Sequence, residues 1–349
     1  MNIDVFAGAQ ALQHIQQNGF QPKDIRLMVG ASGGPKWLVL SRLDQYLAEN
    51  FINKADQPID LIGSSIGSWR MACYAQQDPL SAFKSFESIY MNQRYESLNP
   101  EEITLFVNKV LDQLFDDEKS QFIVNNEKRR LHVVAVRNRR LMNGRSNISQ
   151  AIGLLTAATG NLLSSKVVEA LYPRVLISQG SSHGPYYDRP EVIELGVHNL
   201  REALVASGAI PMALEPIKVA GGKERWHWDG GIVDYHFKGP FNTDNGLVFY
   251  PHFSPKVVPG WFDKSIPWRR AKAKDYSNVV MVAPSNEFIA KLPYGKIPDR
   301  KDFVKMDDEQ RETYWQQVLT ATDALVEDFH ELWSKDQFAN RVQLIDSIL

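Results

Sequence analysis

The chain has 349 residues, of which 44% are hydrophobic and 23% are charged, and these proportions argue against a disordered or fibrous protein. Its formal net charge of −2 at pH 7 argues against bulk attraction to nucleic acid or to an anionic membrane as the basis of its function. The single cysteine, Cys73, excludes a disulfide framework within the chain and a cysteine-rich zinc site.

The first third of the chain predicts a strand–helix–strand unit. An apolar run at 25–29 predicts a buried strand, and residues 36–49 carry leucines at helical spacing. A second short strand is predicted at 59–62, and a second helix at 68–76. Two strands joined through a helix within about 40 residues predict a parallel sheet covered by helices on both faces.

The rest of the chain continues the α/β pattern without an internal repeat. Further strands are predicted at 131–136, 175–178, 247–250 and 279–282, and helices at 80–95, 100–125, 148–171, 200–207 and 307–333. Residues 253–275 are rich in proline, aromatic and basic residues and predict a long loop. Because the composition never shifts abruptly, we expect one α/β domain over 1–349, with helical additions to a mostly parallel sheet.

The first candidate motif is G-x-S-x-G, formed by Gly63-Ser64-Ser65-Ile66-Gly67. It follows a predicted strand and precedes a predicted helix, which is the context that a nucleophilic serine elbow requires. Small neighbours permit the tight turn, and the helix N-terminus favours a developing anion. The alternative is a glycine-bordered loop without catalytic function.

A second loop, Gly30-Ala31-Ser32-Gly33-Gly34-Pro35-Lys36, also joins a strand to a helix. Its sequence does not fit a Walker A loop, because proline and tryptophan replace the required glycine and hydroxyl residue, and its spacing does not fit a dinucleotide fingerprint. An oxyanion hole fits better, since neighbouring strands would bring this loop and the Ser65 turn to the same sheet edge. A tight turn without a ligand remains the alternative.

Two further motifs are weaker when taken alone. Trp228-Asp229-Gly230-Gly231 places an uncrowded carboxylate before a sharp turn, which is equally typical of an ordinary Asp-Gly turn. The segment 206–211, Ala-Ser-Gly-Ala-Ile-Pro, indicates only the end of a helix followed by proline.

Together and in this order, the four motifs resemble those of the patatin-like phospholipases. The agreement spans about residues 25–235, and we expect the strands and helices of 245–349 to pack on this core. The resemblance implies a three-layer α/β/α sandwich and a serine–aspartate dyad without an essential histidine. It implies Ser65 as the nucleophile, Asp229 as its partner and general base, and Gly33 and Gly34 as amide donors of the oxyanion hole. The residues implied in support are Gly30, Lys36, Gly63, Gly67, Gly230 and Gly231.

The chain departs from the family pattern at two places. Ala31 and Ser32 interrupt the usual glycine run, and Pro35-Lys36 stand where the family commonly has Arg-Gly. We expect Lys36 to supply the missing positive charge. Asp234 stands near a position where the family often has asparagine.

The reaction implied is hydrolysis of a lipid acyl ester, of the phospholipase A, lysophospholipase or carboxylesterase type, without a cofactor or metal. A free carboxylate is a poor base for serine, so the dyad requires desolvation of Asp229 or a stabilised oxyanion. Trp226 and Trp228 are candidates for an apolar surround, although the core is the more usual place for them. For a rival Ser-His-Asp triad, His252 and His330 are the candidates.

The remaining alternatives concern the acceptor and the surroundings. The same acyl-enzyme would serve an acyltransferase, and loss of catalysis would leave a lipid-binding module. Residues 261–274 place tryptophans beside lysines and arginines, which is typical of a membrane interface, while a solvated loop is the alternative. The first residues lack the basic region of a signal peptide, and no apolar run reaches the ~20 residues of a spanning helix, so we expect a cytoplasmic protein, with peripheral membrane contact as an option.

Overall fold

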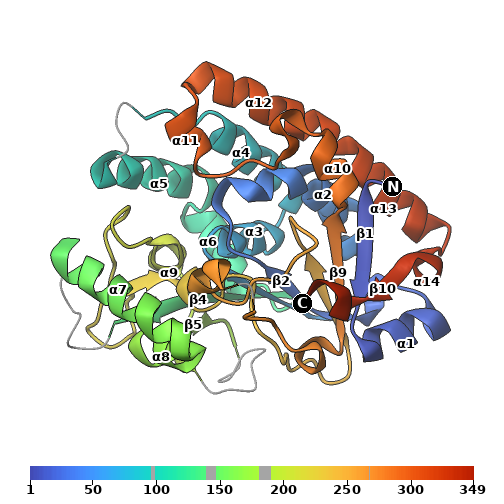
Figure 1. The fold of residues 1–349 in the computed structure, drawn as a ribbon, viewed down its shortest axis with the longest axis horizontal. Coiled ribbons are helices and arrows are strands. Elements are labelled where there is room, and N and C mark those ends of the chain that lie inside the picture. Colours follow the sequence, from blue (N-terminus) through green and yellow to red (C-terminus); the bar gives the residue numbers. More distant parts are fainter. Residues whose placement is uncertain (96–98, 139–146, 181–189, 267) are drawn as a thin grey trace.

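The structure is a computed structural model that describes residues 1–349 except 96–98, 139–146, 181–189 and 267 (Figure 1). Within the described residues, ten strands form one sheet. The strands are β1 (Ile3–Ala7), β2 (Ile25–Gly30), β3 (Ile59–Ser64), β4 (Arg129–Arg137), β5 (Arg174–Ser178), β6 (Glu191–Glu194), β7 (His227–Asp229), β8 (Leu247–Pro251), β9 (Val279–Pro284) and β10 (Val342–Leu344).

Helices cover the sheet and also lie along its edges (Figure 1). The α-helices of the described residues are α1 (Ala9–Asn18), α2 (Ser41–Tyr46), α3 (Ile66–Tyr74), α4 (Pro79–Met91), α5 (Pro100–Leu114), α6 (Asp117–Asn125), α7 (Asn147–Leu163), α8 (Ser165–Leu171), α9 (Leu200–Gly208), α10 (Asn286–Lys291), α11 (Asp302–Lys305), α12 (Asp308–Ala321), α13 (Asp323–Ser334) and α14 (Phe338–Arg341). In Figure 1, α12 and α13 follow one border of the molecule, and α7 and α8 lie at the opposite side.

The strand order is β10-β1-β9-β8-β2-β3-β4-β5-β6, and β7 pairs with β4. The central strands β9, β8, β2, β3 and β4 all run parallel, whereas β1, β5 and β7 pair antiparallel with their neighbours in this group. The predicted α/β sandwich with a mostly parallel sheet is therefore confirmed. In the register of β2 and β3, Gly30 lies opposite Gly63, so the two glycine-bordered loops leave the same sheet edge side by side.

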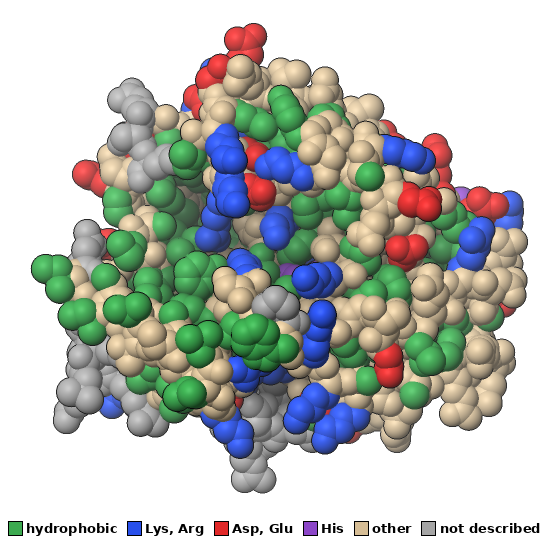
Figure 2. Space-filling model, in the orientation of Figure 1, with side chains coloured by type: hydrophobic (Ala, Val, Ile, Leu, Met, Phe, Trp, Pro, Cys, Tyr) green, Lys and Arg blue, Asp and Glu red, His purple; other side chains and the backbone are tan. Residues whose placement is uncertain are grey.

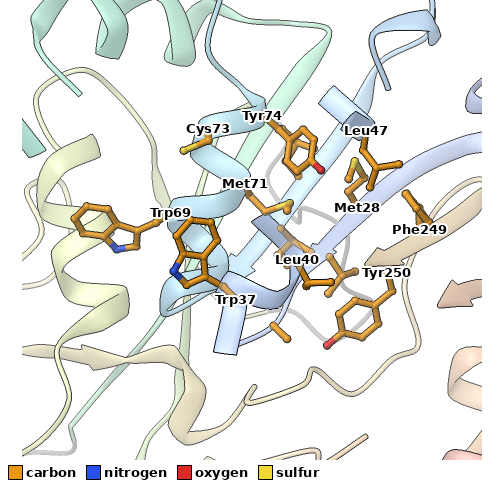
Figure 3. Close-up of a cluster of buried hydrophobic side chains, with 14 of the residues drawn as sticks. Met28, Trp37, Leu40, Leu47, Trp69, Met71, Cys73, Tyr74, Phe249 and Tyr250 are labelled. Atoms are coloured by element: carbon orange, nitrogen blue, oxygen red, sulfur yellow. The ribbon is translucent and has the colours of Figure 1, made fainter. Parts of the chain in front are cut away.

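The core lies between the central strands and the helices α2 and α3. Figure 3 shows Met28 of β2, Met71 and Tyr74 of α3 and Phe249 of β8 within one cluster of buried side chains. Because central parallel strands are covered on both faces, nearly every side chain of β2, β3 and β8 is apolar and buried. This packed layer holds the amino-terminal end of α3, and thus the Ser65 turn, in a fixed position.

Three long helices predicted from apolar periodicity are each divided in two. The 100–125 helix breaks before Asp116, whose side chain accepts a hydrogen bond from the Lys119 amide and starts α6. The 148–171 helix breaks at Ser164, which caps α8 through the Lys166 amide, and the 307–333 helix breaks at Thr322. Asp116 and Ser164 begin new helices because their side chains satisfy a free N–H group of the first turn, whereas the Thr322 hydroxyl donates to the carbonyl of Leu319 and caps no N–H group.

The prediction of one regular helix at 36–49 is wrong. The segment starts as a 3₁₀ helix (Gly34–Leu40), continues as α2 and ends in a π-helical turn (Leu47–Phe51). Most of its side chains are buried, so packing overrides the regular helical period. The strands β1, β6, β7 and β10 were not predicted. β6, β7 and β10 have only 3 or 4 residues, too few for a clear apolar period.

Candidate active site

Ser65 occupies a strained turn between β3 and α3. Its backbone has φ 55° and ψ −131°, a conformation that is costly for a residue with a side chain. A Cβ atom on Gly67 would lie 1.9 Å from the carbonyl oxygen of Gly30, so only glycine lets the start of α3 approach the end of β2 this closely. Gly63 meets the same constraint against the backbone of Gly67. The strain and the close packing together fix the direction of the Ser65 side chain.

The structure brings Ser65 and Asp229 together, although 164 positions separate them in the sequence. The hydroxyl of Ser65 donates a hydrogen bond to Oδ2 of Asp229 at 2.8 Å, and both residues are buried. Asp229 ends β7, and its pairing with Ala135 of β4 carries it toward the Ser65 turn. The amide of Gly231 donates to Oδ1 of Asp229 at 2.7 Å, which fixes the orientation of the carboxylate.

The surroundings make Asp229 a stronger base than a free aspartate. Burial raises the pKa of Asp229, while Arg300, the Gly231 amide and the Ser65 hydroxyl partly oppose this rise. A higher pKa increases the tendency of the carboxylate to take a proton from serine. The desolvation that the sequence argument required is therefore present at this carboxyl group.

The loop at 30–36 lies beside this pair. Within the described part of the chain, neither the amide of Gly33 nor that of Gly34 donates to a protein acceptor. Gly34 has φ 55°, and a Cβ atom there would lie 2.9 Å from Nε of Arg300. The buried Ser32 shares a hydrogen bond of 2.8 Å with Ser64, which ties the loop to the serine turn. The interruption of the glycine run thus provides an anchor for the loop.

Sequence reasoning missed Ser207, the residue that supports the Ser65 backbone. Its hydroxyl accepts from the Ser65 amide at 2.9 Å, donates to the carbonyl of Val134 at 2.6 Å, and lies 2.7 Å from the hydroxyl of Ser68. Ala209, two residues further, accepts from the Asp229 amide at 2.9 Å. The segment 206–211 therefore contacts the backbone of both Ser65 and Asp229. The only sequence signal for this role was the place of the segment in the ordered set of motifs.

Two cavities meet at Ser65. The first has a volume of about 510 Å³. Its lining combines the apolar residues Leu154, Ile210, Pro211, Ile232 and Trp261 with the charged residues Lys36, Asp229, Lys264, Asp299, Arg300 and Lys301, and it also includes Ser32, Gly33, Gly231 and Tyr235. The second has a volume of about 320 Å³, and its largely apolar lining includes Trp69, Phe86, Tyr90, Ile103, Phe106, Val107, Val110, Leu204, Leu214 and Phe303. Ser65, Ile210 and Arg300 line both cavities. A group bound at Ser65 thus has a cavity with several charged residues on one side and, on the other, a cavity in which Arg300 is the only charged residue among the described lining.

A family model for patatin-like phospholipases matches residues 52–236, which is more than half of the chain. The chain belongs to the patatin-like phospholipase family. Comparisons with curated proteins and with solved structures returned no match. The patatin-like region contains Ser65, Ser207 and Asp229, whereas the loop at 30–36 and the cavity residues Lys264 and Arg300 lie outside it.

The histidines proposed for a rival triad lie away from Ser65. His252 is buried, its Nδ1 lies 2.5 Å from the carbonyl oxygen of Ser254, and burial lowers its pKa to about 3. His330 shares a hydrogen bond of 2.7 Å with the hydroxyl of Tyr46. No histidine among the described residues lines either cavity, and His183 lies outside the described residues. This patatin-like site therefore has no described imidazole beside its serine.

The two tryptophans near Asp229 and the acid Asp234 take structural positions in the fold. Trp228 packs in a buried cluster with Val136, whereas Trp226 lies half-buried with Nζ of Lys218 5.4 Å from its ring centroid. Asp234 is fully buried in a two-bond ion pair with Arg174.

In the part of the chain that the structure describes, no group of three or more His, Cys, Asp or Glu side chains is placed to hold a metal ion. None of the described helices combines the length and apolar character needed to cross a membrane.

Proposed function

We propose that the protein hydrolyses lipid acyl esters through an acyl-enzyme on Ser65, with Asp229 as the general base. The observation that carries this proposal is the 2.8 Å hydrogen bond from the serine hydroxyl to a buried carboxylate, made at a strained turn where two cavities meet. Membership of a family of lipid acyl hydrolases supports the same reaction.

In the first half of the reaction, Oγ of Ser65 attacks the ester carbonyl while its proton passes to Asp229. The negative charge that develops on the carbonyl oxygen meets the free amides of Gly33 and Gly34, and one such donor contributes about 3 kcal/mol in a dry site. Collapse of the intermediate breaks the bond to the alcohol oxygen, which takes the proton from Asp229. The products of this half are the free alcohol and the acyl-enzyme.

In the second half, a water molecule gives its proton to Asp229 and attacks the acyl carbonyl. The Ser65 oxygen then leaves with the proton, and the fatty acid is released. An alcohol in place of water would make the same acyl-enzyme an acyltransferase, so the ratio of hydrolysis to transfer in the presence of glycerol measures which acceptor this site uses.

A fluorophosphonate probe tests the proposal, because it bonds covalently only to an activated serine. We expect labelling of the wild type at the peptide that contains Ser65, retained labelling in His330→Ala, and none in Ser65→Ala. Absence of labelling in the folded wild type would favour a binding module without catalysis and contradict the proposal.

We further propose that the membrane contact predicted for 261–274 includes the neighbouring helix α7. The sequence of α7 contains no charged residue, and its exposed side chains Ile148, Ile152, Leu155, Leu162 and Leu163 recur at helical spacing. Asn161 of α7 donates a hydrogen bond of 2.8 Å to Asp263, so the helix and the loop form one surface. Figure 2 shows hydrophobic side chains over α7 and lysine and arginine side chains through the middle of the same face.

Vesicle sedimentation tests this contact. We expect binding to vesicles that contain anionic lipid, and weaker binding of Trp268→Ala and Leu163→Ser, whose side chains are 72% and 87% exposed. The exposed Leu344 lies on β10 at the sheet edge, and Leu344→Ser is the matched control. Equal binding of all these proteins would dismiss the membrane surface.

A further inference from the structure

The first cavity gathers positive charge from segments that are distant in the sequence. Lys36 comes from the loop after β2, Lys264 from the 3₁₀ helix Trp261–Ser265, and Arg300 from the segment before α11. Nζ of Lys264 lies 3.7 Å from the ring centroid of Tyr235, and Nζ of Lys36 lies 5.2 Å from that of Phe253. Figure 2 shows lysine and arginine side chains in a band through the middle of the face that it draws.

These cations lack the usual carboxylate partners. Among the described residues, no carboxylate oxygen lies within 4.0 Å of the charged nitrogens of Lys36, Lys264 or Arg300. The acids in the cavity lining are Asp229, which is bonded to Ser65, and Asp299, which accepts from Lys296 and the Lys301 amide.

The unpaired cations repel one another. Desolvation in the cavity, together with Lys36 and Arg300, lowers the pKa of Lys264 to about 7, and only Asp229 opposes this change. Desolvation is also the main cause that lowers the pKa of Lys36. Such a group of cations in a cleft attracts an anion and is stabilised by binding one.

The second cavity determines which part of an ester meets these cations. The ester carbonyl must lie at Ser65, so its acyl chain and its alcohol extend into different cavities. Burial among Trp69, Phe106 and Leu214 stabilises an acyl chain. A charged group would lose its hydration there, and Arg300 is the only charged residue among the described lining that could compensate. The acyl chain therefore fits the apolar cavity, and the alcohol side fits the cationic cavity.

We propose that Lys36, Lys264 and Arg300 form a binding site for a phosphate or carboxylate on the alcohol side of the substrate. The substrate class is then a single-chain acyl ester with an anionic alcohol, and Arg300, which lines both cavities, is a specificity-determining residue. This inference depends on the proposed function for the role of Ser65. It further specifies that the alcohol side of the substrate is anionic, and which cavity receives the acyl chain and which the alcohol.

A matched pair of substrates tests the charge preference. A monoacylglycerol and its phosphate monoester carry the same ester bond and differ in the charge on the alcohol side. For Arg300→Gln and Lys264→Gln we expect the ratio of kcat/KM for the phosphate ester to kcat/KM for the neutral ester to fall by about tenfold, because any effect of either charge on Asp229 is common to both substrates. Lys84→Gln removes an exposed charge on α4, outside both cavities, and is the control that should change neither value.

A binding measurement without turnover separates this inference from the proposed function. With Ser65→Ala, calorimetry should show that decyl phosphate binds at least about tenfold more tightly than inorganic phosphate, because its chain fills the apolar cavity. Adding Arg300→Gln should weaken decyl phosphate binding by about tenfold. If Ser65→Ala binds with these values while the wild type hydrolyses no ester, the anion site is supported and the hydrolase is refuted. Equal binding of decyl and inorganic phosphate, or equal affinities with and without Arg300, would overturn the inference even if esters are hydrolysed.

Discussion

Replacement of Ser207 by alanine tests how the serine turn is held. The Ser207 hydroxyl has one proton, which must go to the carbonyl of Val134, because a carbonyl oxygen only accepts. The amide of Ser65 and the hydroxyl of Ser68 therefore both donate to Ser207. Ser207→Ala removes all three bonds at once and leaves three buried polar groups without this partner.

The three buried polar groups that lose Ser207 as a partner determine the expected loss of stability. Each buried polar group left without a partner costs about 1 kcal/mol or more, so the free energy of unfolding should fall by about 3 kcal/mol. The freed Ser65 amide also loosens the turn that aims its hydroxyl at Asp229, and we expect the rate of fluorophosphonate labelling to fall by at least about tenfold.

Urea unfolding and the labelling rate measure the two effects separately. Ser68→Ala is the matched control, since it removes only one of the bonds and none to the Ser65 backbone. We expect it to cost about 1 kcal/mol and to retain most of the labelling rate. A Ser207→Ala protein with wild-type stability and labelling would refute the reasoning that this hydroxyl positions the nucleophile.

Two further predictions concern charge. Because the pKa of Lys264 is about 7, its ammonium form is present below that pH and lost above it, so KM for an anionic ester should rise between about pH 6 and about pH 8. Lys264→Arg should remove this rise in steady-state kinetics, and an unchanged pH profile of KM would argue against contact with the anion. Asp44→Asn leaves the fully buried Arg70 without the carboxylate that now holds it through two hydrogen bonds of 2.8 Å, and we expect the free energy of unfolding in urea to fall by about 3–5 kcal/mol. A loss below about 1 kcal/mol would show that this ion pair does not stabilise the fold.

The parallel sheet and the serine turn were predictable because their signals are local. The apolar runs of β2 and β3 and the glycines around Ser65 lie within a short stretch of the chain, where periodicity and turn chemistry act directly. The juxtaposition of Ser65 and Asp229 came only from the order of four motifs, since 164 positions separate them.

The polar support of the site was not predictable in the same way. Ser207 lies in the last turn of α9, in a segment that on its own indicated only the end of a helix, and Arg300 reaches the cavity from a segment with no motif. Both residues act through tertiary contacts that no local pattern encodes. The divided helices have a more local explanation, because capping by side chains such as Asp116 competes with a periodic apolar face.

The most direct test of the central claim is the turnover of an acyl ester by Asp229→Asn. An amide of the same shape cannot take the serine proton, so we expect kcat to fall by about 10²–10⁴-fold while the protein stays folded. His252→Ala should keep most of the wild-type turnover. An Asp229→Asn protein with wild-type kcat would contradict the serine–aspartate mechanism.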